Sequence, residues 1–217
     1  MKTFFSIVIL AIVILAIVMS IKIYKQNKEI GGIEKAEITE SAEKTEVATG
    51  DSTITITKTS SGITQTGDMT IDEENTFLKF TGFGPGKEHE GSFDTMKADI
   101  IFDNGSMSGG KLIIEASSIN TGIDGLDNHL KTDDFLDTEI NPQIEFKLID
   151  VVVKDEDQSA TALGEITIKG ITKNISVPLT ILANGFSVDF LLDVSLFGIS
   201  YIGVNNEVQI ESQVIWK

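Results

Sequence analysis

Residues 175–192 read ISVPLTILANGFSVDFLL, and this stretch decides the fold. Apolar and polar side chains alternate over 175–181 and again over 186–192. This period of two is typical of strands that turn one face to a core. Asn184-Gly185 stands between the runs and favours a tight hairpin, because both residues tolerate positive φ. The stretch therefore predicts two antiparallel strands, with Pro178 marking an edge or an irregularity.

The same alternation recurs through most of the chain after Met69. Further alternating runs lie at 78–81, 97–103, 111–115, 143–148, 165–169 and 208–216. Asn104-Gly105 predicts another tight turn, and the polar segment 154–157 predicts a longer one. About eight strands with such punctuation indicate an all-β fold, either an antiparallel barrel or a sandwich.

The N-terminus has a different composition. Residues 3–21, TFFSIVILAIVILAIVMSI, carry no charge and would span roughly 28 Å as a helix, close to the hydrocarbon thickness of a bilayer. The run is longer than a typical signal-peptide core and lacks a good A-x-A cleavage pattern. We therefore expect residues 1–22 to form a transmembrane anchor or signal-anchor. Lysine counts on the two sides of the run leave its orientation open.

Residues 23–68 separate the anchor from the alternating part. This segment is rich in Lys, Glu, Thr and Ser and poor in large apolar side chains. Such a composition buries little surface, so we expect a flexible polar linker. The predicted organisation is an anchor, this linker and a β domain over 69–217.

The charge of the chain excludes one class of partner. The formal net charge is −16, with 17 basic residues against 33 acidic ones, and every basic residue is a lysine. Nucleic-acid binding requires clustered positive charge, so we expect no nucleic-acid partner. The absence of arginine also removes the usual bidentate clamp for phosphate, and the absence of cysteine excludes disulfides and thiolate metal sites.

One stretch, GLDNHLKTDDFLD at 125–137, breaks the period of two. Leu126, His129 and Leu130 follow helical spacing, and Thr132 resembles an N-cap before two acidic residues. We expect one or two short helical turns, with His129 on the apolar face. A metal site built from His129, His89 and nearby aspartates is the alternative interpretation.

Several segments occur in the order and spacing of one known family. They are MTIDEENTFLKFTGFG (69–84), GKEHEGSFDTMKADIIF (86–102), SSINTG (117–122), LDNHLKTDDFLDTEINPQIEF (126–146), GEITIKGITKNISVPL (164–179) and DVSLFGISY (193–201). The D-x-H-L-x-x-x-x-F core, the NP-x-I-x-F segment and G-x-I-T-I-K-G-I-T are specific as a set. The chain resembles the YceI-like family of bacterial exported lipid-binding proteins over residues 69–217.

The resemblance implies a lipocalin-like antiparallel β-barrel around a long apolar channel that holds isoprenoid chains or similar amphiphiles. It aligns His89, Asp127, His129 and the Phe197-Gly198-Ile199 element with family motifs. The expected ligand-binding residues are Phe80, His89, Phe93, Phe102, His129, Leu130, Phe135, Phe146, Phe190 and Phe197. Where many relatives carry arginines this chain has Leu126 and Val194, which favours a neutral or weakly polar head group.

The sequence therefore predicts a membrane-tethered carrier for a long-chain lipid such as a polyisoprenoid. The resemblance places the barrel outside the cytoplasm, on a single-pass anchor in the cell membrane. We expect no cofactor and no enzymatic activity, since no G-x-S-x-G, H-E-x-x-H or phosphate-binding loop occurs. The alternatives are a metal-binding or metal-dependent hydrolytic module using His89 and His129, and a barrel filled by its own side chains that acts as an interaction module.

Overall fold

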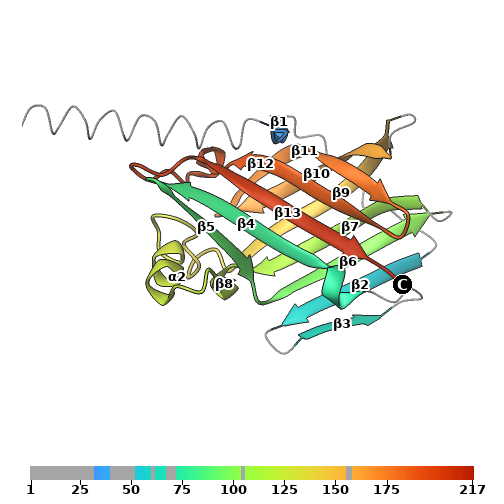
Figure 1. The fold of residues 1–217 in the computed structure, drawn as a ribbon, viewed down its shortest axis with the longest axis horizontal. Helices are drawn as coiled ribbons and strands as arrows, with labels where there is room; N and C mark the ends of the chain where they lie inside the picture. The colour runs from blue at the N-terminus through green and yellow to red at the C-terminus, as the bar shows by residue number, and fades with distance from the viewer. Residues whose placement is uncertain (1–31, 40–51, 60–61, 67–71, 104–105, 155–157) are drawn as a thin grey trace, which may run out of the picture.

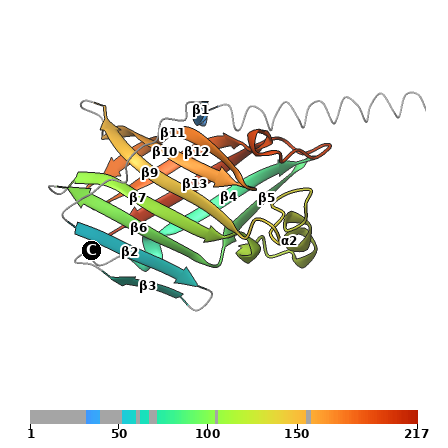
Figure 2. The same ribbon diagram turned by 180° about the vertical axis from the view of Figure 1, so that it is seen from behind.

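The protein forms one antiparallel β-sheet, closely curled, with a short helical insertion at one end (Figures 1 and 2). The computed structural model describes residues 32–39, 52–59, 62–66, 72–103, 106–154 and 158–217. The alternating side chains of the sequence give each strand an inner and an outer face. The prediction of an all-β antiparallel fold with one short helix is confirmed.

The described residues contribute thirteen strands to the sheet. They are β1 (Glu37–Thr39), β2 (Ser52–Thr59), β3 (Gly62–Thr66), β4 (Phe77–Gly84), β5 (Lys87–Phe93), β6 (Met96–Asp103), β7 (Ser106–Glu115), β8 (Ile119–Asn120), β9 (Gln143–Val153), β10 (Ser159–Ile168), β11 (Ile171–Leu182), β12 (Gly185–Asp193) and β13 (Glu207–Ile215). The helix is α2 (Asp124–Leu130), and 3-10 turns cover η1 (Glu73–Asn75), η2 (Ala116–Ser118) and η3 (Val194–Phe197).

The sheet differs from the predicted barrel of about eight strands. Its pairing order is β3-β2-β6-β7-β9-β10-β11-β12-β13-β4-β5-β8, with β1 added to β11. Among the described strands no ladder joins the β3 end of this path to the β8 end, so the sheet is an open curl. Its concave side faces inward and is called the lumen below.

Strands β1, β2 and β3 lie within the range where the sequence predicted a linker. β2 pairs with β6 from Ser52↔Phe102 to Lys58↔Met96, and β3 pairs with β2 outside it. Composition did not reveal these strands, because threonine-rich residues gain a buried face only by pairing with a neighbour. Of this range, only residues 23–31, 40–51, 60–61 and 67–68 lie outside the described part.

Residues 33–39, called the N-terminal bridge below, fill a seam in the wall. β11 and β12 pair only from Thr180 to Leu182, and elsewhere they separate. In this gap β1 pairs with residues 174–176 of β11, while Leu191 of β12 donates its N–H to the Glu34 carbonyl (3.0 Å) and accepts from the Ala36 N–H (3.0 Å). The bridge therefore connects β11 and β12 along the part of their length where they do not pair with each other.

Two turn signals in the sequence have a local explanation. Leu182 pairs with Gly185, so the hairpin predicted at Asn184-Gly185 forms, with Ala183 and Asn184 as its two turn residues. Pro178 lies in the interval of β11 after its pairing with β1 ends and before its pairing with β12 begins. The predicted irregularity is thus the change of partner along β11. The Asn104-Gly105 pair lies outside the described residues.

In the described part of the chain, no helix has the length and apolarity needed to cross a bilayer. The anchor expected over residues 1–22 lies outside that part.

Candidate functional site

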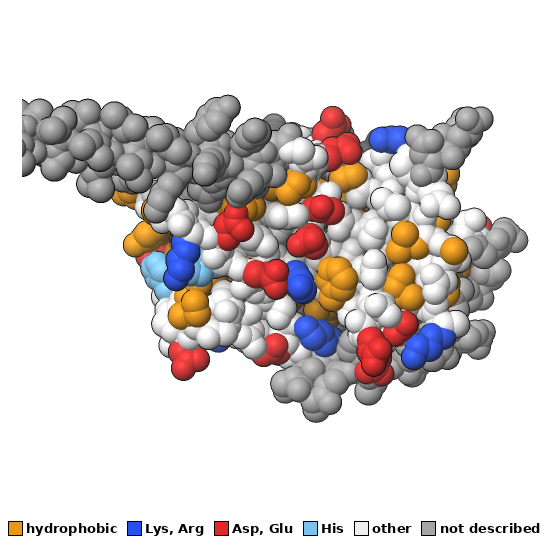
Figure 3. Space-filling model, viewed as in Figure 1, with side chains coloured by type: hydrophobic (Ala, Val, Ile, Leu, Met, Phe, Trp, Pro, Cys, Tyr) orange, Lys and Arg blue, Asp and Glu red, His pale blue; other side chains and the backbone are white. Residues whose placement is uncertain are grey.

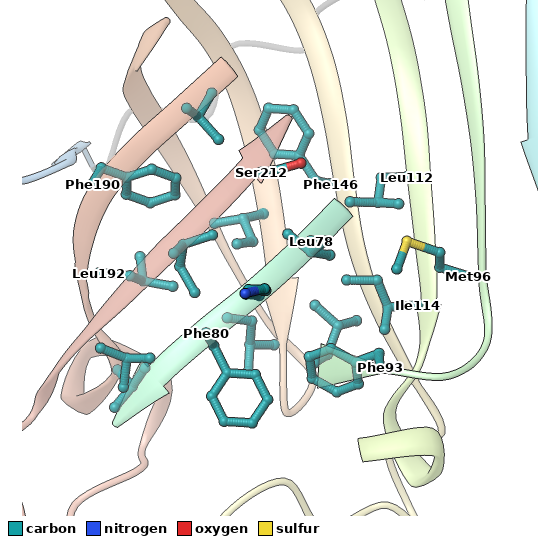
Figure 4. A pocket seen from close by; sticks show the side chains of 18 of the residues that line it. Leu78, Phe80, Phe93, Met96, Leu112, Ile114, Phe146, Phe190, Leu192 and Ser212 are labelled. Carbon is teal, nitrogen blue, oxygen red and sulfur yellow. The ribbon is translucent and has the colours of Figure 1, made fainter. Parts of the chain in front are cut away.

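The lumen contains a cavity of about 550 Å³. Alternate residues of the strands point into it, and Figure 4 shows aliphatic and aromatic side chains gathered between the strands. Lining residues with apolar side chains include Leu78, Phe80, Phe93, Met96, Leu112, Ile114, Ile144, Phe146, Leu148, Ile166, Ile175, Val177, Phe190, Leu192, Val208 and Ile210. A cavity of this size and character is typical of a small-molecule site.

Two glycines in the wall give large aromatic rings room to lie flat. Gly91 pairs with Phe80, and a Cβ added to Gly91 would overlap the Phe80 ring. Gly164 pairs with Leu148, but a Cβ added to it would lie 2.7 Å from the ring of nearby Phe146 and 2.5 Å from the Lys147 carbonyl oxygen. Because each ring rests on a bare backbone, it lines the wall and leaves the lumen open. The filled-barrel alternative therefore has no support at these positions.

The helical insertion shapes one end of the cavity, called the mouth below. Leu126, His129 and Leu130 of α2 all line the cavity, which confirms that they share one face of the helix. The His129 ring meets the rings of Phe135 (centroids 5.0 Å apart) and Tyr201 (5.3 Å) edge-on, and Phe135 stacks on Tyr201 at 5.4 Å. Tyr201 lines the cavity and is 43% exposed, so the cavity reaches the surface here.

The opposite end is occupied by packed aromatic side chains. Phe102 is buried and meets the Trp216 ring edge-on at 6.0 Å. Phe186 lies 6.5 Å from Trp216, and Met107 packs against the same cluster. This end is therefore packed with side chains, whereas the cavity reaches the surface at the mouth.

Asp127, the acidic residue in the middle of α2, is engaged in local structure. The Asp127 carboxylate accepts hydrogen bonds from the Thr121 backbone N–H (2.8 Å) and hydroxyl (2.6 Å). Thr132 does not cap a second helix as predicted: residues 131–136 form turns, and its hydroxyl donates to the His129 carbonyl. Asp137, whose φ is 50°, separates these turns from a further turn at 138–140, so no continuous helix forms.

The metal interpretation requires His89 and His129 to converge with carboxylates. Within the described residues, no group of three or more His, Asp or Glu side chains is placed to hold a metal ion. His129 packs against two aromatic rings instead. The geometry of the site gives this alternative no support.

Eight of the ten residues predicted to bind a ligand line the cavity. These eight are Phe80, His89, Phe93, His129, Leu130, Phe135, Phe146 and Phe190. Phe102 belongs to the packed cluster at the closed end, and Phe197 is fully buried in the main core. Contact of the eight with a ligand stays a prediction.

Tyr201 is an aromatic residue of the mouth that was not among the ten predicted from the sequence. It completes the ring cluster with His129 and Phe135. The available signal was its place two residues after Ile199, at the end of the DVSLFGISY segment. Many other lining positions were missed because aliphatic side chains at strand spacing are the same whether they fill a core or surround a cavity.

The polar groups of the mouth are uncharged hydrogen-bonding groups or histidines. His89, Thr121, His129, Tyr201, Asn205 and Asn206 line this part of the cavity. Leu126 and Val194, which stand where the resemblance implied arginines, line the cavity too. The charged lining residues Lys58, Lys79, Asp99 and Lys111 are all partly or fully exposed, and no described charged residue is buried. A neutral head group fits this mouth better than a phosphate.

Comparison with known proteins places this geometry in a family. The chain is similar to the UPF0312 proteins of Pseudomonas paraeruginosa (31% identity) and Pectobacterium carotovorum (29%), each over 97 residues. Each match covers 44% of this chain and 50% of the relative, so the chain spans about half the length of the curated relatives it matches.

Solved structures share the fold at low identity. BcnA from Burkholderia cenocepacia superimposes with a TM-score of 0.60 and 20% identity, over 67% of this chain and 98% of BcnA. A polyisoprenoid binding domain from Saccharophagus degradans, implicated in plant cell wall breakdown, gives 0.53 and 13%, over 75% of this chain and 97% of that domain. The Campylobacter jejuni YCEI protein gives a TM-score of 0.53 and 24% identity, over 58% of this chain and 84% of that protein.

Finally, the YceI-like domain family model matches residues 69–215, which span β4 to the end of β13. A curled antiparallel sheet around an apolar lumen, with this match over most of its length, makes the chain a member of the YceI-like family.

Proposed function

We propose that this protein binds and carries a long-chain amphiphilic lipid, a polyisoprenoid or a similar molecule. The tail lies in the lumen and the polar head remains at the mouth. The observation that carries the proposal is the cavity of about 550 Å³, whose wall is almost entirely aliphatic and aromatic. Burial of a hydrocarbon chain is favourable by roughly 0.8 kcal/mol per CH₂ group before the costs of binding. The name of the Saccharophagus degradans domain, which binds polyisoprenoids, agrees with this chemistry.

The location belongs to the same proposal. Residues 1–22 anchor the chain in the cell membrane, and the lipid-binding domain lies on the extracytoplasmic side. The support is the uncharged run over 3–21 and the resemblance to an exported family. Protease accessibility of the domain in intact and permeabilised cells tests this part: digestion only after permeabilisation of the inner membrane contradicts it.

The test of lipid binding uses a plug inside the lumen. A Cβ at Gly82 would meet nothing within 4 Å, and Gly82 lines the cavity, so Gly82→Phe places a ring in the open space. The matched control is Thr81→Phe, the neighbouring residue on the alternate face of β4. The full chain is purified in detergent, loaded with a C55 polyprenol and examined by native mass spectrometry. We expect the parent protein and T81F to retain one bound lipid. In G82F the fraction of protein that carries lipid should fall at least tenfold. Equal retention by all three would refute binding in the lumen.

A further inference from the structure

Exposed apolar side chains gather around the mouth. Nine large hydrophobic residues of the described part are well exposed, and six lie at the mouth end, five in segments that connect strands and one, Ile171, at the first position of β11. These six, called the rim below, are Ile123, Ile140, Ile171, Leu196, Tyr201 and Ile202. Ile202 is 99% exposed and Ile140 is 77% exposed. Single exposed apolar residues are ordinary, whereas a group of them around an opening marks an interaction site.

The connections that carry the rim are in contact with one another. Tyr201 stacks on Phe135 of the helical insertion, and Lys169 of the β10–β11 turn donates to the Asp133 carbonyl. Ile171 lies 3.8 Å from the position of a Cβ on Gly198, which follows η3. Figure 3 shows hydrophobic side chains beside a histidine at this end of the molecule. The rim is therefore part of a single surface around the mouth.

The path of the N-terminal chain points to the occupant of that surface. The N-terminal bridge begins at the mouth end, where Ile33 packs against Phe83 and Leu191 and Lys35 reaches Asp193 and Glu207. Ile33 lies only twelve positions after Ile21, the last residue of the uncharged run. Twelve residues span at most about 40 Å. With that run in a bilayer, the rim is held within reach of the same bilayer.

We propose that the rim docks on the bilayer in which the chain is anchored, so that the amphiphile passes between membrane and lumen without crossing water. This inference rests on the proposed function, since it names the partner of the same mouth. Contact is made by apolar insertion, because the acidic residues Asp124, Asp133, Asp134 and Glu139 next to the rim disfavour an anionic surface. Docking is therefore strongest on zwitterionic lipid and weakens as anionic lipid is added.

The absence of cysteine allows a direct test in the full chain. Ile202→Cys at the rim and Val153→Cys at the end of β9, remote from the mouth, are each labelled with an environment-sensitive fluorophore. Both proteins are reconstituted through their own anchors into phosphatidylcholine vesicles that contain spin-labelled lipid. We expect strong quenching at position 202, little at 153, and at least threefold less quenching at 202 with 40% phosphatidylglycerol.

Weak and equal quenching at the two positions would overturn the proposal. Quenching at 202 that follows the density of protein rather than of spin-labelled lipid would also overturn it and identify a second copy as the occupant. A second measurement compares Ile202→Asp with Val153→Asp. The rim variant should take up a fluorescent polyprenol from vesicles about tenfold more slowly, yet hold the same amount at equilibrium in detergent. If no variant holds lipid at equilibrium, the proposed function fails, while the quenching result still decides whether the rim docks.

Discussion

At the scale of single residues, the contact between Gly91 and Phe80 controls the width of the lumen. The two residues are direct partners across β4 and β5, and the ring lies where a Cβ of residue 91 would be. Phe80 also lies beside Phe93, with ring centroids 5.6 Å apart, so it has little room to move sideways. Any side chain at position 91 must push the ring away from the wall.

Gly91→Ala should therefore destabilise the fold and narrow the cavity. We expect a loss of about 1–3 kcal/mol in the free energy of unfolding, because the inserted methyl overpacks the site. Gly82→Ala is the matched control on the facing strand, since its methyl enters open space. It should remain within about 1 kcal/mol of the parent protein. Urea titration measures both variants, and equal stabilities would show that the ring moves freely.

At the scale of elements, the N-terminal bridge fills the gap in the sheet between β11 and β12. Ala36 is buried in the main core cluster, and Ile38 packs against the same cluster. The bridge lies outside residues 69–215, the part that the family model matches. A segment that precedes the family domain thus completes the lumen of this protein.

Ala36→Asp should open the seam between β11 and β12. Placing a carboxylate among apolar neighbours should lower the free energy of unfolding by about 2–4 kcal/mol and speed the release of bound lipid. Glu37→Ala, at the adjacent exposed position, should leave both quantities near those of the parent. Stopped-flow transfer of a fluorescent polyprenol to acceptor vesicles gives the release rate. Unchanged release from a destabilised A36D variant would mean that the bridge supports stability alone.

Lys35 fastens the bridge through a pH-dependent contact. Its ammonium donates to Glu207 (2.9 Å) and lies 3.5 Å from Asp193. The hydrogen bond to Glu207 raises the pKa of Lys35 above its ordinary value, although desolvation opposes it. Because the folded-state pKa is raised, the stabilisation is complete below the ordinary pKa of lysine and is lost as pH rises through the raised pKa.

Lys35→Met should therefore cost stability at neutral pH and little at strongly alkaline pH. The side chain is 48% exposed, so the loss at pH 7 should be at most about 1 kcal/mol. Urea titrations of parent and variant across the alkaline range measure the difference. A difference that grows with pH would contradict the sign of this linkage.

At the scale of the whole molecule, charge and lining together set the preference for a head group. The net charge of −16 repels anions, and no arginine is available to clamp a phosphate. We expect a polyprenol to outcompete the polyprenyl phosphate of equal length by tenfold or more in native mass spectrometry. If the phosphate binds more tightly instead, its head group lies at the partly or fully exposed lysines of the lining.

Tyr201→Phe should reduce binding of the polyprenol less than tenfold, because only one neutral hydrogen bond is removed.

The strands β4, β6, β7 and β9 to β13 could be predicted because each alternates apolar and polar residues between turn signals. β5 and β8 could not, since KEHEGSF shows no such alternation and β8 has only two residues. β2 and β3 could not, since β2 is held by pairing with β6, a partner far along the chain, and β3 is held by pairing with β2. The sequence also could not predict that the lumen is open, because this depends on the register that sets Gly91 opposite Phe80 and Gly164 beside Phe146. The helical face of His129 was predictable from local spacing, whereas Tyr201 reaches the same site only through tertiary packing.

The position of the N-terminal bridge in the sequence also affects how the protein folds during its synthesis. Lys35 lies 158 residues before Asp193 and 172 before Glu207, so the ribosome makes the bridge long before its partners exist. During that interval the bridge has no partner strands and the sheet around the lumen is incomplete. Contacts between residues so far apart in the sequence also form slowly. A lipid present during translation can be enclosed as the last strands arrive. Cell-free synthesis with polyprenol added either during or after translation measures this effect, and higher occupancy in the first case would show that cargo is acquired at synthesis.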